Sequence, residues 1–360
     1  MKRILFIISK LNYSGSAKIA TFVSNNLAKL GYSVYVYTYA SNQCHYPLLD
    51  SVTYIPENNV YSDPIFKRLM PIVRVRRHIK RISPHIVISF ITNANFISII
   101  ATAFTGIPVV IAERSDPYNE KNLSLSIMRW FYKYASGVVF QTEGAKSYYN
   151  SKIQNKGIVI PNPVIAEQID PLPFEQRKNE MAFVGRFNIK QKRQDIMVKA
   201  FKKVVEKHKN INLVFYGDGP DIDIVKKMVK EYGLNDNVIF AGKVDNITSY
   251  LRKAKIFVLT SDYEGIPNAL IEAMSLGLPI VSTDCSPGGA RLLIQNNVNG
   301  VLVPKGSVDE IANAIDYLLS NPHVAENYGK EARKIVKRFS PEKIMTKWVQ
   351  YIEDLITNRV

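Results

Sequence analysis

Cysteine and long apolar runs are scarce in this 360-residue sequence. The two cysteines, Cys44 and Cys285, are too few for a disulfide framework or a cysteine-based metal site, so we expect a reducing environment. The longest apolar runs, for example Ile107–Ala112, stop far short of the ~18 residues that a membrane span needs. Met1-Lys2-Arg3 leads into a short apolar run with no small-residue cleavage site, so we expect no signal peptide.

Acidic residues are also scarce relative to basic ones. The chain carries 47 Lys and Arg against 31 Asp and Glu, a net charge of +16. Residues 1–165 hold 19 basic and 7 acidic residues, whereas residues 166–360 hold 28 and 24. This imbalance predicts that the first half of the chain meets an anionic surface, either a membrane or a nucleic acid.

The rest of the composition is typical of a folded α/β protein. With 46% apolar and 11% aromatic residues, the chain is neither disordered nor fibrous, and its length favours two domains. Apolar runs of strand length alternate with helical patterns, which indicates parallel sheets covered on both faces. The predicted strands are 3–9, 33–39, 86–90, 108–112, 137–141 and 157–160, then 181–184, 212–216, 237–241, 256–260, 279–283 and 300–303.

Prolines mark the boundary between these two series. Four of them lie between Pro161 and Pro173, as expected of a linker. We therefore predict two doubly wound, Rossmann-like α/β domains, residues 1–165 and 166–340, with an amphipathic closing helix at about 341–360 that crosses back to the first domain. Ligands of open α/β sheets bind outside the carboxyl ends of the strands, so two such domains facing across a cleft would hold one substrate each.

The strongest chemical signal directly follows the predicted strand at 256–260. Gly265 and Pro267 mark the point where the chain begins a helix, whose first amides form an anion site. Glu264 can hold the loop or a ligand hydroxyl, and Glu272, one turn into the helix, can reach sugar hydroxyls. Alternatively, Glu264 only caps the helix and Glu272 is a solvated surface residue.

A second signal, Gly185-Arg186, ends the first predicted strand of the second domain. Glycine permits close approach of a ligand, Arg186 can hold a phosphate through two hydrogen bonds, and Lys192 adds a second cation. Two cations and a helix N-terminus would neutralise a diphosphate leaving group without a metal. The alternative is a solvated surface cluster, which we favour for Lys190 and Arg193.

These two motifs, in this order, resemble those of the retaining glycosyltransferases of glycosyltransferase family 4, of the bacterial surface-polysaccharide type, which have the GT-B fold. The resemblance extends over the whole chain. Glu264 and Glu272 match the family's E-x7-E motif, and Arg186 with Lys192 matches its diphosphate clamp. The resemblance implies a nucleotide-sugar donor in the C-terminal domain, an acceptor in the N-terminal domain, and catalytic roles for Glu264, Arg186 and Lys192. The donor-binding residues that it implies are Gly15, Ser16, Gly185, Arg186, Lys192, Gly265, Ile266, Pro267, Asn268, Ala269 and Glu272.

The chain departs from the family in its first domain. The usual Gly-Gly after the first strand is Gly15-Ser16 here, which can face the donor or form a simple βα turn. No histidine lies between residues 86 and 207, where many members place one near the sugar. We predict instead that Glu113, Arg114 and Asp116 contact the acceptor, unless they pair among themselves. Asp221-Ile222-Asp223 opens a helix, where aspartates act as caps, so we predict no metal site and no cofactor besides the nucleotide-sugar co-substrate.

Residues 67–81 contain seven basic residues, interleaved with apolar ones, and no acidic residue. The apolar residues cluster on one side of a helical wheel. This pattern is typical of a helix on an anionic membrane surface, or of a surface helix that packs its apolar face on a sheet. Pro71 would interrupt such a helix or begin it. The residues predicted to face the membrane are Lys67, Arg68, Arg74, Arg77, Lys80 and Arg81.

The sequence thus predicts a retaining hexosyl- or N-acetylhexosaminyltransferase of the EC 2.4 class. It would move a sugar from a UDP-sugar to a lipid-linked or polysaccharide-precursor acceptor, as in capsule or O-antigen synthesis. We expect it in the cytoplasm, peripheral on the inner face of the cell membrane, with an anionic membrane surface and no nucleic acid as partner. Two alternatives stay open: a sugar-nucleotide epimerase of the same fold, and a nucleic-acid-binding protein, which the net charge motivates without a recognised motif.

Overall fold

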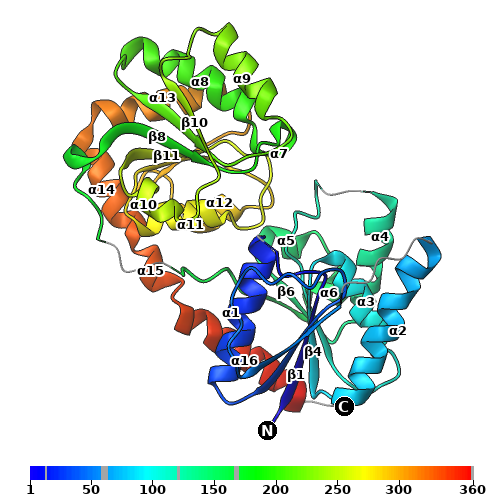
Figure 1. The fold of residues 1–360 in the computed structure, drawn as a ribbon. Helices are drawn as coiled ribbons and strands as arrows, with labels where there is room; N and C mark the ends of the chain where they lie inside the picture. The colour runs from blue at the N-terminus through cyan, green and yellow to red at the C-terminus, as the bar shows by residue number, and fades with distance from the viewer. Residues whose placement is uncertain (13, 58–63, 120–121, 166–169, 358–360) are drawn as a thin grey trace. The chain divides into compact units, whose positions relative to one another are not determined.

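The computed structural model describes residues 1–357 except 13, 58–63, 120–121 and 166–169, and of residues 64–68 it describes the backbone alone. The chain forms two compact units (Figure 1). Unit 1 comprises Met1–Pro163 together with Pro341–Val360, and unit 2 comprises Val164–Ser340. The sequence predicts a boundary after residue 165, two residues further along the same proline-rich segment.

The sheet of unit 1 is parallel, with seven strands in the order β3-β2-β1-β4-β5-β6-β7. Helices α1 and α16 cover one face, and α2, α3 and α4 cover the other (Figure 1). The central strands are apolar throughout because both of their faces are covered. The strands are β1 (Arg3–Ile8), β2 (Ser33–Thr38), β3 (Val52–Pro56), β4 (Ile86–Phe90), β5 (Val109–Ala112), β6 (Gly137–Phe140) and β7 (Gly157–Val159).

The helices of unit 1 follow local sequence signals. The Ser14 hydroxyl accepts a hydrogen bond from the Ala17 amide (3.3 Å) and so caps the start of the first helix, which ends just before Gly31, at φ +88°. The helices are α1 (Gly15–Lys29), α2 (Pro64–Ile82), α3 (Thr92–Thr102), α4 (Leu123–Trp130), the 3-10 helix η1 (Phe131–Tyr134), α5 (Glu143–Ser147), α6 (Ser151–Gln154) and α16 (Pro341–Thr357).

Proline does not break α2. The helix runs from Pro64 through Pro71 to Ile82, so the predicted interruption or start at Pro71 is wrong. Val75 and Ile79 are buried against the sheet, and this packing holds the turns on the carboxyl side of the proline in helical form. The apolar face of α2 is therefore mainly core.

The last helix, α16, returns to unit 1. Trp348 is fully buried and stacks on Phe90 of β4, with ring centroids 6.0 Å apart. The Tyr351 hydroxyl accepts a hydrogen bond from the Val138 amide (2.9 Å), and a Cβ at Gly137 would come within 2.4 Å of that hydroxyl. The absence of a side chain at Gly137 thus allows α16 to pack closely against the sheet of unit 1.

Unit 2 contains a second parallel sheet, six strands in the order β10-β9-β8-β11-β12-β13. Together the two sheets confirm the predicted α/β class. The strands are β8 (Lys178–Val184), β9 (Asn212–Tyr216), β10 (Val238–Gly242), β11 (Ala254–Leu259), β12 (Ile280–Thr283) and β13 (Val301–Val303). The helices are η2 (Phe174–Gln176), α7 (Ile189–Lys192), α8 (Gln194–Lys207), α9 (Ile222–Glu231), α10 (Ile247–Leu251), α11 (Asn268–Ser275), α12 (Gly289–Leu293), α13 (Val308–Ser320), α14 (Pro322–Arg333) and α15 (Ile335–Arg338).

Every predicted strand is present, but the sequence misses β3. This strand lies at the edge of its sheet and pairs only with β2 among the described residues. Thr53 and Pro56 on it are exposed, so it lacks the apolar run by which the buried strands are recognised.

Candidate functional site

Strands β8 and β11 are neighbours in unit 2 and run parallel, so the loops that follow them emerge side by side. Lys192, at the end of α7, forms an ion pair with Glu264 in the loop after β11. Their side chains are 16% and 11% exposed, which places the pair at the rim of the sheet with access to solvent. The structure therefore brings together two residues predicted to be catalytic.

Glycines allow this close approach. A Cβ on Gly185, which follows β8, would lie 3.3 Å from the Lys192 side chain. A Cβ on Gly217, at φ +135°, would lie 2.1 Å from the Gly185 carbonyl oxygen. The Thr260 hydroxyl donates to the Lys192 carbonyl at 2.8 Å, which ties α7 to the end of β11. The loops around the ion pair are thus fixed by backbone contacts.

Glu264 is held by its own loop and by the loop after β12 rather than by the following helix. The Ser261 hydroxyl donates to Glu264 Oε1 (2.9 Å), and the Glu264 amide donates to the Ser286 carbonyl (2.7 Å). The residue at the cap position of α11 is Pro267, which makes no side-chain capping hydrogen bond, so the alternative in which Glu264 is its cap is wrong. Ser261 is missing from the predicted set, and its one sequence signal is a hydroxyl placed directly after a buried strand.

A thiol lies beneath this cluster. Cys285 is buried, and this burial together with the negative charge of Glu264 raises the pKa of its thiol to about 12. The thiol is therefore neutral at physiological pH and does not act as an anionic ligand or nucleophile there.

Arg186 and the start of α11 complete the arrangement in unit 2. Arg186 is exposed directly after β8, and its guanidinium has no hydrogen bond or ion pair with any described residue. Glu272 is half-buried about one turn inside α11. A Cβ on Gly289 would lie 1.9 Å from the Gly265 oxygen, so α12 supports the loop leading to Pro267. One unpaired guanidinium, one ammonium and an uncapped helix N-terminus form a setting suited to an anion.

The two neighbouring basic residues differ from each other. Lys190 is exposed, as expected for a surface residue. Arg193 is not a simple solvated cation: it donates to Asp262 (2.9 Å) and Asp195 (3.0 Å), and its backbone is left-handed at φ 52° between α7 and α8. Its hydrogen bonds to Asp195 and then to Asp262 raise the pKa of Arg193 above its usual value. Arg193 therefore fixes the turn that positions Lys192.

Two further predicted donor-binding residues, Gly15 and Ser16, belong to unit 1. They form the first turn of α1, directly after the cap residue Ser14, at the end of the segment that connects β1 to this helix. The Ser16 hydroxyl lies 3.3 Å from that of Ser14. Their place at the carboxyl end of the central strand agrees with a βα turn, and their contact with a donor stays a prediction.

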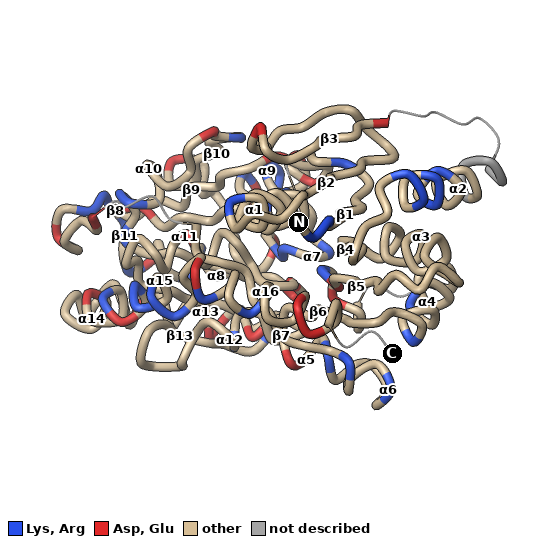
Figure 2. The backbone as a smooth tube through the Cα atoms, turned by 90° about the horizontal axis from the view of Figure 1, so that it is seen from below, with Lys and Arg blue, Asp and Glu red and all other residues tan. Residues whose placement is uncertain are grey.

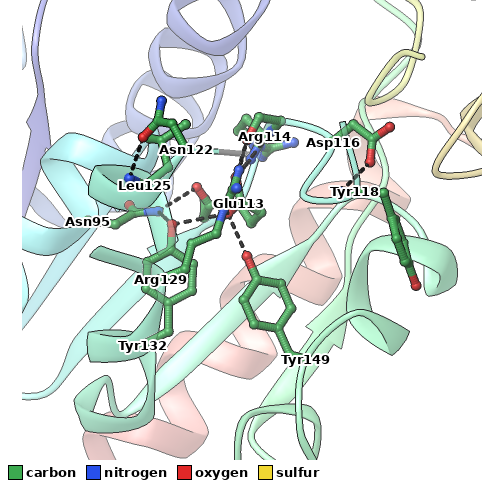
Figure 3. Close-up of polar contacts among 12 residues, drawn as sticks. Asn95, Glu113, Arg114, Asp116, Tyr118, Asn122, Leu125, Arg129, Tyr132 and Tyr149 are labelled. Carbon is green, nitrogen blue, oxygen red and sulfur yellow. Dashed lines mark hydrogen bonds and ion pairs between the residues drawn. The ribbon is translucent and has the colours of Figure 1, made fainter. Parts of the chain in front are cut away.

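Figure 3 shows Glu113 at the centre of a buried polar cluster in unit 1. Its Oε2 accepts hydrogen bonds from Tyr149 (2.7 Å), Tyr132 (3.1 Å) and Arg129 (3.3 Å), and its Oε1 accepts one from the Ser115 hydroxyl (2.7 Å). Burial, and then the charge of Glu113, raises the pKa of both tyrosines well above the usual value, so they remain donors. The structure corrects the prediction for Glu113: its oxygens are occupied, and it anchors the fold rather than an acceptor.

Asp116 and Arg114 are placed differently from each other. Asp116 is buried and accepts from the Tyr118 amide (2.9 Å) and the Asn119 side chain (2.6 Å), so it too serves its own loop. Arg114 donates to Asn162 (2.9 Å), but its Nε and Nη2 atoms are buried with no partner among the described residues. Burial lowers the pKa of Arg114 to about 9. Of the three residues predicted to contact the acceptor, Arg114 alone has N–H groups without a hydrogen-bond partner among the described residues.

The structure divides the basic residues predicted to face a membrane. Arg74 donates to Glu57 at 2.7 Å with its side chain largely covered, so it is an internal ion pair and not a free surface cation. The side chains of Lys67 and Arg68 lie outside those that the structure describes. Arg77, Lys80 and Arg81 are exposed. Along the described parts of the chain, no helix combines the length and apolarity that crossing a membrane requires.

The aspartates at the start of α9 have structural partners. Asp221 accepts from the Ile189 amide (2.8 Å) and so holds the start of α7, while Asp223 is exposed near Lys226. Among the described residues, no three His, Cys, Asp or Glu side chains come together in a group able to hold a metal ion.

The chain is similar to known proteins along almost its whole length. A family model described as "Glycosyltransferase Family 4" matches residues 13–168, and one described as "Glycosyl transferases group 1" matches residues 164–335. An uncharacterized glycosyltransferase of Haemophilus influenzae is 25% identical, over 97% of this chain and 99% of its own length. The Campylobacter jejuni GalNAc-alpha-(1->4)-GalNAc-alpha-(1->3)-diNAcBac-PP-undecaprenol alpha-1,4-N-acetyl-D-galactosaminyltransferase is 25% identical, over 99% of both chains. The structure of Anabaena HepE in complex with UDP and glucose has the same fold, with a TM-score of 0.82 and 17% identity over 98% of this chain and 100% of that one.

Proposed function

The chain belongs to the glycosyltransferases that join a Glycosyltransferase Family 4 domain to a Glycosyl transferases group 1 domain, and on this premise we propose that it transfers a sugar, with retention, from a UDP-sugar to a lipid-linked acceptor. It is a glycosyltransferase of the GT-B type that acts in polysaccharide or glycolipid synthesis. The donor, the stereochemistry, the acceptor and a place at the inner face of the cell membrane are the proposal.

The unpaired Arg186 beside the Lys192–Glu264 pair carries the proposal. A nucleoside diphosphate gains negative charge as its bond to the sugar breaks, so cations aimed at that charge lower the barrier. Arg186 can bind a phosphate through two hydrogen bonds, and Lys192 supplies a second charge that Glu264 keeps in place. The uncapped amides of α11 add a third source of positive potential. These groups supply the required neutralisation from the chain itself, so we propose that transfer needs no metal.

The acceptor hydroxyl attacks the face of the sugar that the diphosphate leaves. Its oxygen forms the new bond to the anomeric carbon as the bond to the phosphate oxygen breaks, and the departing phosphate takes the hydroxyl proton. A double displacement would need a free carboxylate as nucleophile. Glu264 is bound by Lys192 and Ser261, which favours a positioning role for its carboxylate.

The names of similar proteins support the choice of substrates. The HepE structure is a complex with UDP and glucose, which favours a UDP-sugar as the donor here. The Campylobacter relative is named for an acceptor on undecaprenyl diphosphate, which favours a lipid-linked acceptor, as in capsule or O-antigen synthesis. The basic surplus of the first 165 residues also agrees with work at an anionic membrane.

Thermal unfolding with UDP, GDP, ADP or no ligand tests this proposal. A ligand at about 100 times its Kd stabilises the folded state by about 2.7 kcal/mol, so UDP should raise the Tm by several degrees. Arg186→Ala should remove most of this shift, whereas Lys190→Ala, a matched change of an exposed cation nearby, should preserve it. Glu272→Ala should abolish sugar transfer while leaving the protein folded. If no nucleotide raises the Tm, the proposed donor site is wrong.

A further inference from the structure

The short segment α4–η1 of unit 1 exposes its apolar side. Leu123, Ile127, Trp130 and Tyr134 are 79%, 51%, 56% and 59% exposed. They follow one another at intervals of four, three and four residues, so they share one side of the helical segment. A surface helix of a globular protein normally turns that stripe toward the core.

Polar anchors fix this orientation. Arg129, which is buried on the opposite side of α4, donates to the buried carboxylate of Glu113, and Tyr132 of η1 donates to the same oxygen (Figure 3). Rotating the apolar stripe inward would break a buried ion pair and expose it. The outward stripe is therefore built into the fold of unit 1.

Helix α2 contributes to the same side of the sheet. Helices α2, α3 and α4 form one layer, with α3 between the other two (Figure 1). Leu69 and Val73 of α2 are 53% and 49% exposed, and exposed Arg77, Lys80 and Arg81 continue along the same helix. Figure 2 shows basic residues along α2 and no acidic residue on α2, α3 or α4.

The charge of this layer is one-sided. Residues 64–134 contain eleven Lys and Arg and three Asp and Glu. Of the three acids, Glu113 and Asp116 are buried, and Glu120 lies outside the described residues. Of the bases, Arg74 and Arg129 are ion-paired, whereas Arg77, Lys80 and Arg81 are exposed. An exposed apolar stripe beside these three cations is complementary to an anionic lipid surface.

A groove borders the stripe. It has a volume of about 630 Å³, and among the residues lining it are Trp130, Lys133, Tyr148 and Lys152, with no acidic residue among those described. Lys133 Nζ lies 3.2 Å from the centroid of the Trp130 indole ring. Tryptophan, tyrosine and lysine side by side are the combination that proteins place at the boundary between lipid headgroups and acyl chains.

We propose that Leu123, Ile127, Trp130 and Tyr134 insert into the headgroup region of an anionic bilayer, with Lys133, Lys152 and the exposed cations of α2 on lipid phosphates. We call these residues the docking face. The proposal deepens the proposed function, on which it rests, because a lipid-linked acceptor requires the enzyme to reach a bilayer. It also differs from the sequence-based prediction, which placed the membrane contact on α2 alone.

The two tryptophans make the proposal directly measurable. Trp130 is 56% exposed, whereas Trp348, on α16, is fully buried. Vesicles of phosphatidylcholine with about a third phosphatidylglycerol should shift the emission of the full-length protein to the blue. Brominated acyl chains should quench part of that emission, because an inserted side chain sits ~5–10 Å below the surface. Trp130→Phe should remove both effects and leave the emission of Trp348 unchanged.

A pair of matched substitutions tests binding itself. Ile127→Asp should weaken binding to the same vesicles by about tenfold, since it places a charge in the inserted stripe. Ile224→Asp is the control: Ile224 is 54% exposed on α9 of unit 2, and its replacement should leave vesicle binding unchanged.

Three outcomes overturn the proposal. Vesicles that do not change Trp130 emission exclude insertion, and equal binding by both aspartate variants excludes the stripe. A concentration-dependent dimer that Ile127→Asp dissociates assigns the stripe to a second copy of the chain. The UDP-induced Tm shift is measured without lipid, so its absence would show that the proposed donor site is wrong while the vesicle result stays valid. A Tm shift without vesicle binding would show that the docking face alone is wrong.

Discussion

Each unit has a glutamate that meets a basic side chain just after a parallel strand, but the two ion pairs differ. Glu113 follows β5 and receives hydrogen bonds from Arg129, Tyr132 and Tyr149, all buried. Glu264 follows β11 and meets Lys192 at a rim that solvent reaches. Two glutamates at the same topological position therefore differ in role. Glu113 is an anchor because the chain supplies every hydrogen-bond donor to it, whereas Glu264 lies in a candidate site where cations can still bind a ligand.

Replacing each glutamate by alanine should separate these roles most strongly. Glu113→Ala leaves Arg129 buried without its partner, so we expect the free energy of unfolding of unit 1 to fall by about 3–5 kcal/mol. Glu264→Ala leaves Lys192 able to turn toward solvent, so we expect a loss of about 1–2 kcal/mol, with sugar transfer falling by about 10²–10³. Urea unfolding and a transfer assay measure both. The distinction fails if Glu264→Ala destabilises the protein as much as Glu113→Ala.

The two arginines of unit 1 sharpen the comparison further. Arg129→Met leaves the Glu113 carboxylate buried without its cation, and we expect a loss of about 3–5 kcal/mol. Arg114→Met removes a guanidinium with two buried, unpartnered nitrogens, so we expect a change within about 1 kcal/mol in either direction. The measurement is urea unfolding without ligands. A large destabilisation by Arg114→Met would show that Arg114 is an anchor like Arg129.

The smallest expected effect is a difference in acid stability between the units. Burial alone would raise the pKa of Glu57, but hydrogen bonds from Tyr37 and His78 and the charge of Arg74 lower it. In unit 2 the pKa of Asp316 is lowered by Lys207 and His208. A lowered carboxyl pKa adds stability above the unfolded-state pKa, and this stability is lost as the pH falls through the folded-state value.

Glu57→Gln and Asp316→Asn should therefore each flatten the loss of stability below about pH 4.5, by less than about 1 kcal/mol. The Lys207–Asp316 pair is the more exposed, with side chains 63% and 25% accessible against 24% for both Arg74 and Glu57. Raising the salt concentration to 1 M should weaken the Asp316 effect more. Equal salt sensitivity of the two variants would contradict this ranking.

The sequence predicts the fold well because most strands can be recognised from their own residues. Runs such as Ile86–Phe90 are apolar throughout, and the residues just after β8 and β11 in unit 2 carry the glycine, arginine and glutamates of the candidate site. These features need only the parallel topology to become neighbours. The edge strand β3 has no such run, so only its pairing with β2 reveals it.

The roles of polar residues in unit 1 could not be predicted in the same way. Glu113, Arg114 and Asp116 look alike in sequence, as polar residues after a strand, but the structure gives them different roles. Glu113 anchors the fold, Arg114 keeps nitrogens without a hydrogen-bond partner, and Asp116 caps its own loop. Asp116 has partners two and three residues away, but the partners that decide the roles of Glu113 and Arg114, which are Tyr132, Tyr149 and Asn162, lie far along the chain. Burial and hydrogen-bond saturation depend on those distant partners.

What the sequence by itself determined is the α/β architecture, the linker and the set of cations and glutamates at the edge of the second sheet. Only the tertiary structure placed Trp348 of α16 against Phe90, turned the apolar side of α4–η1 outward and paired Arg74 internally. The physical reason is the sequence distance over which each kind of interaction acts. Periodicity and turn chemistry act over a few residues, whereas burial of a charge or an apolar stripe is settled by whichever distant segments complete the core.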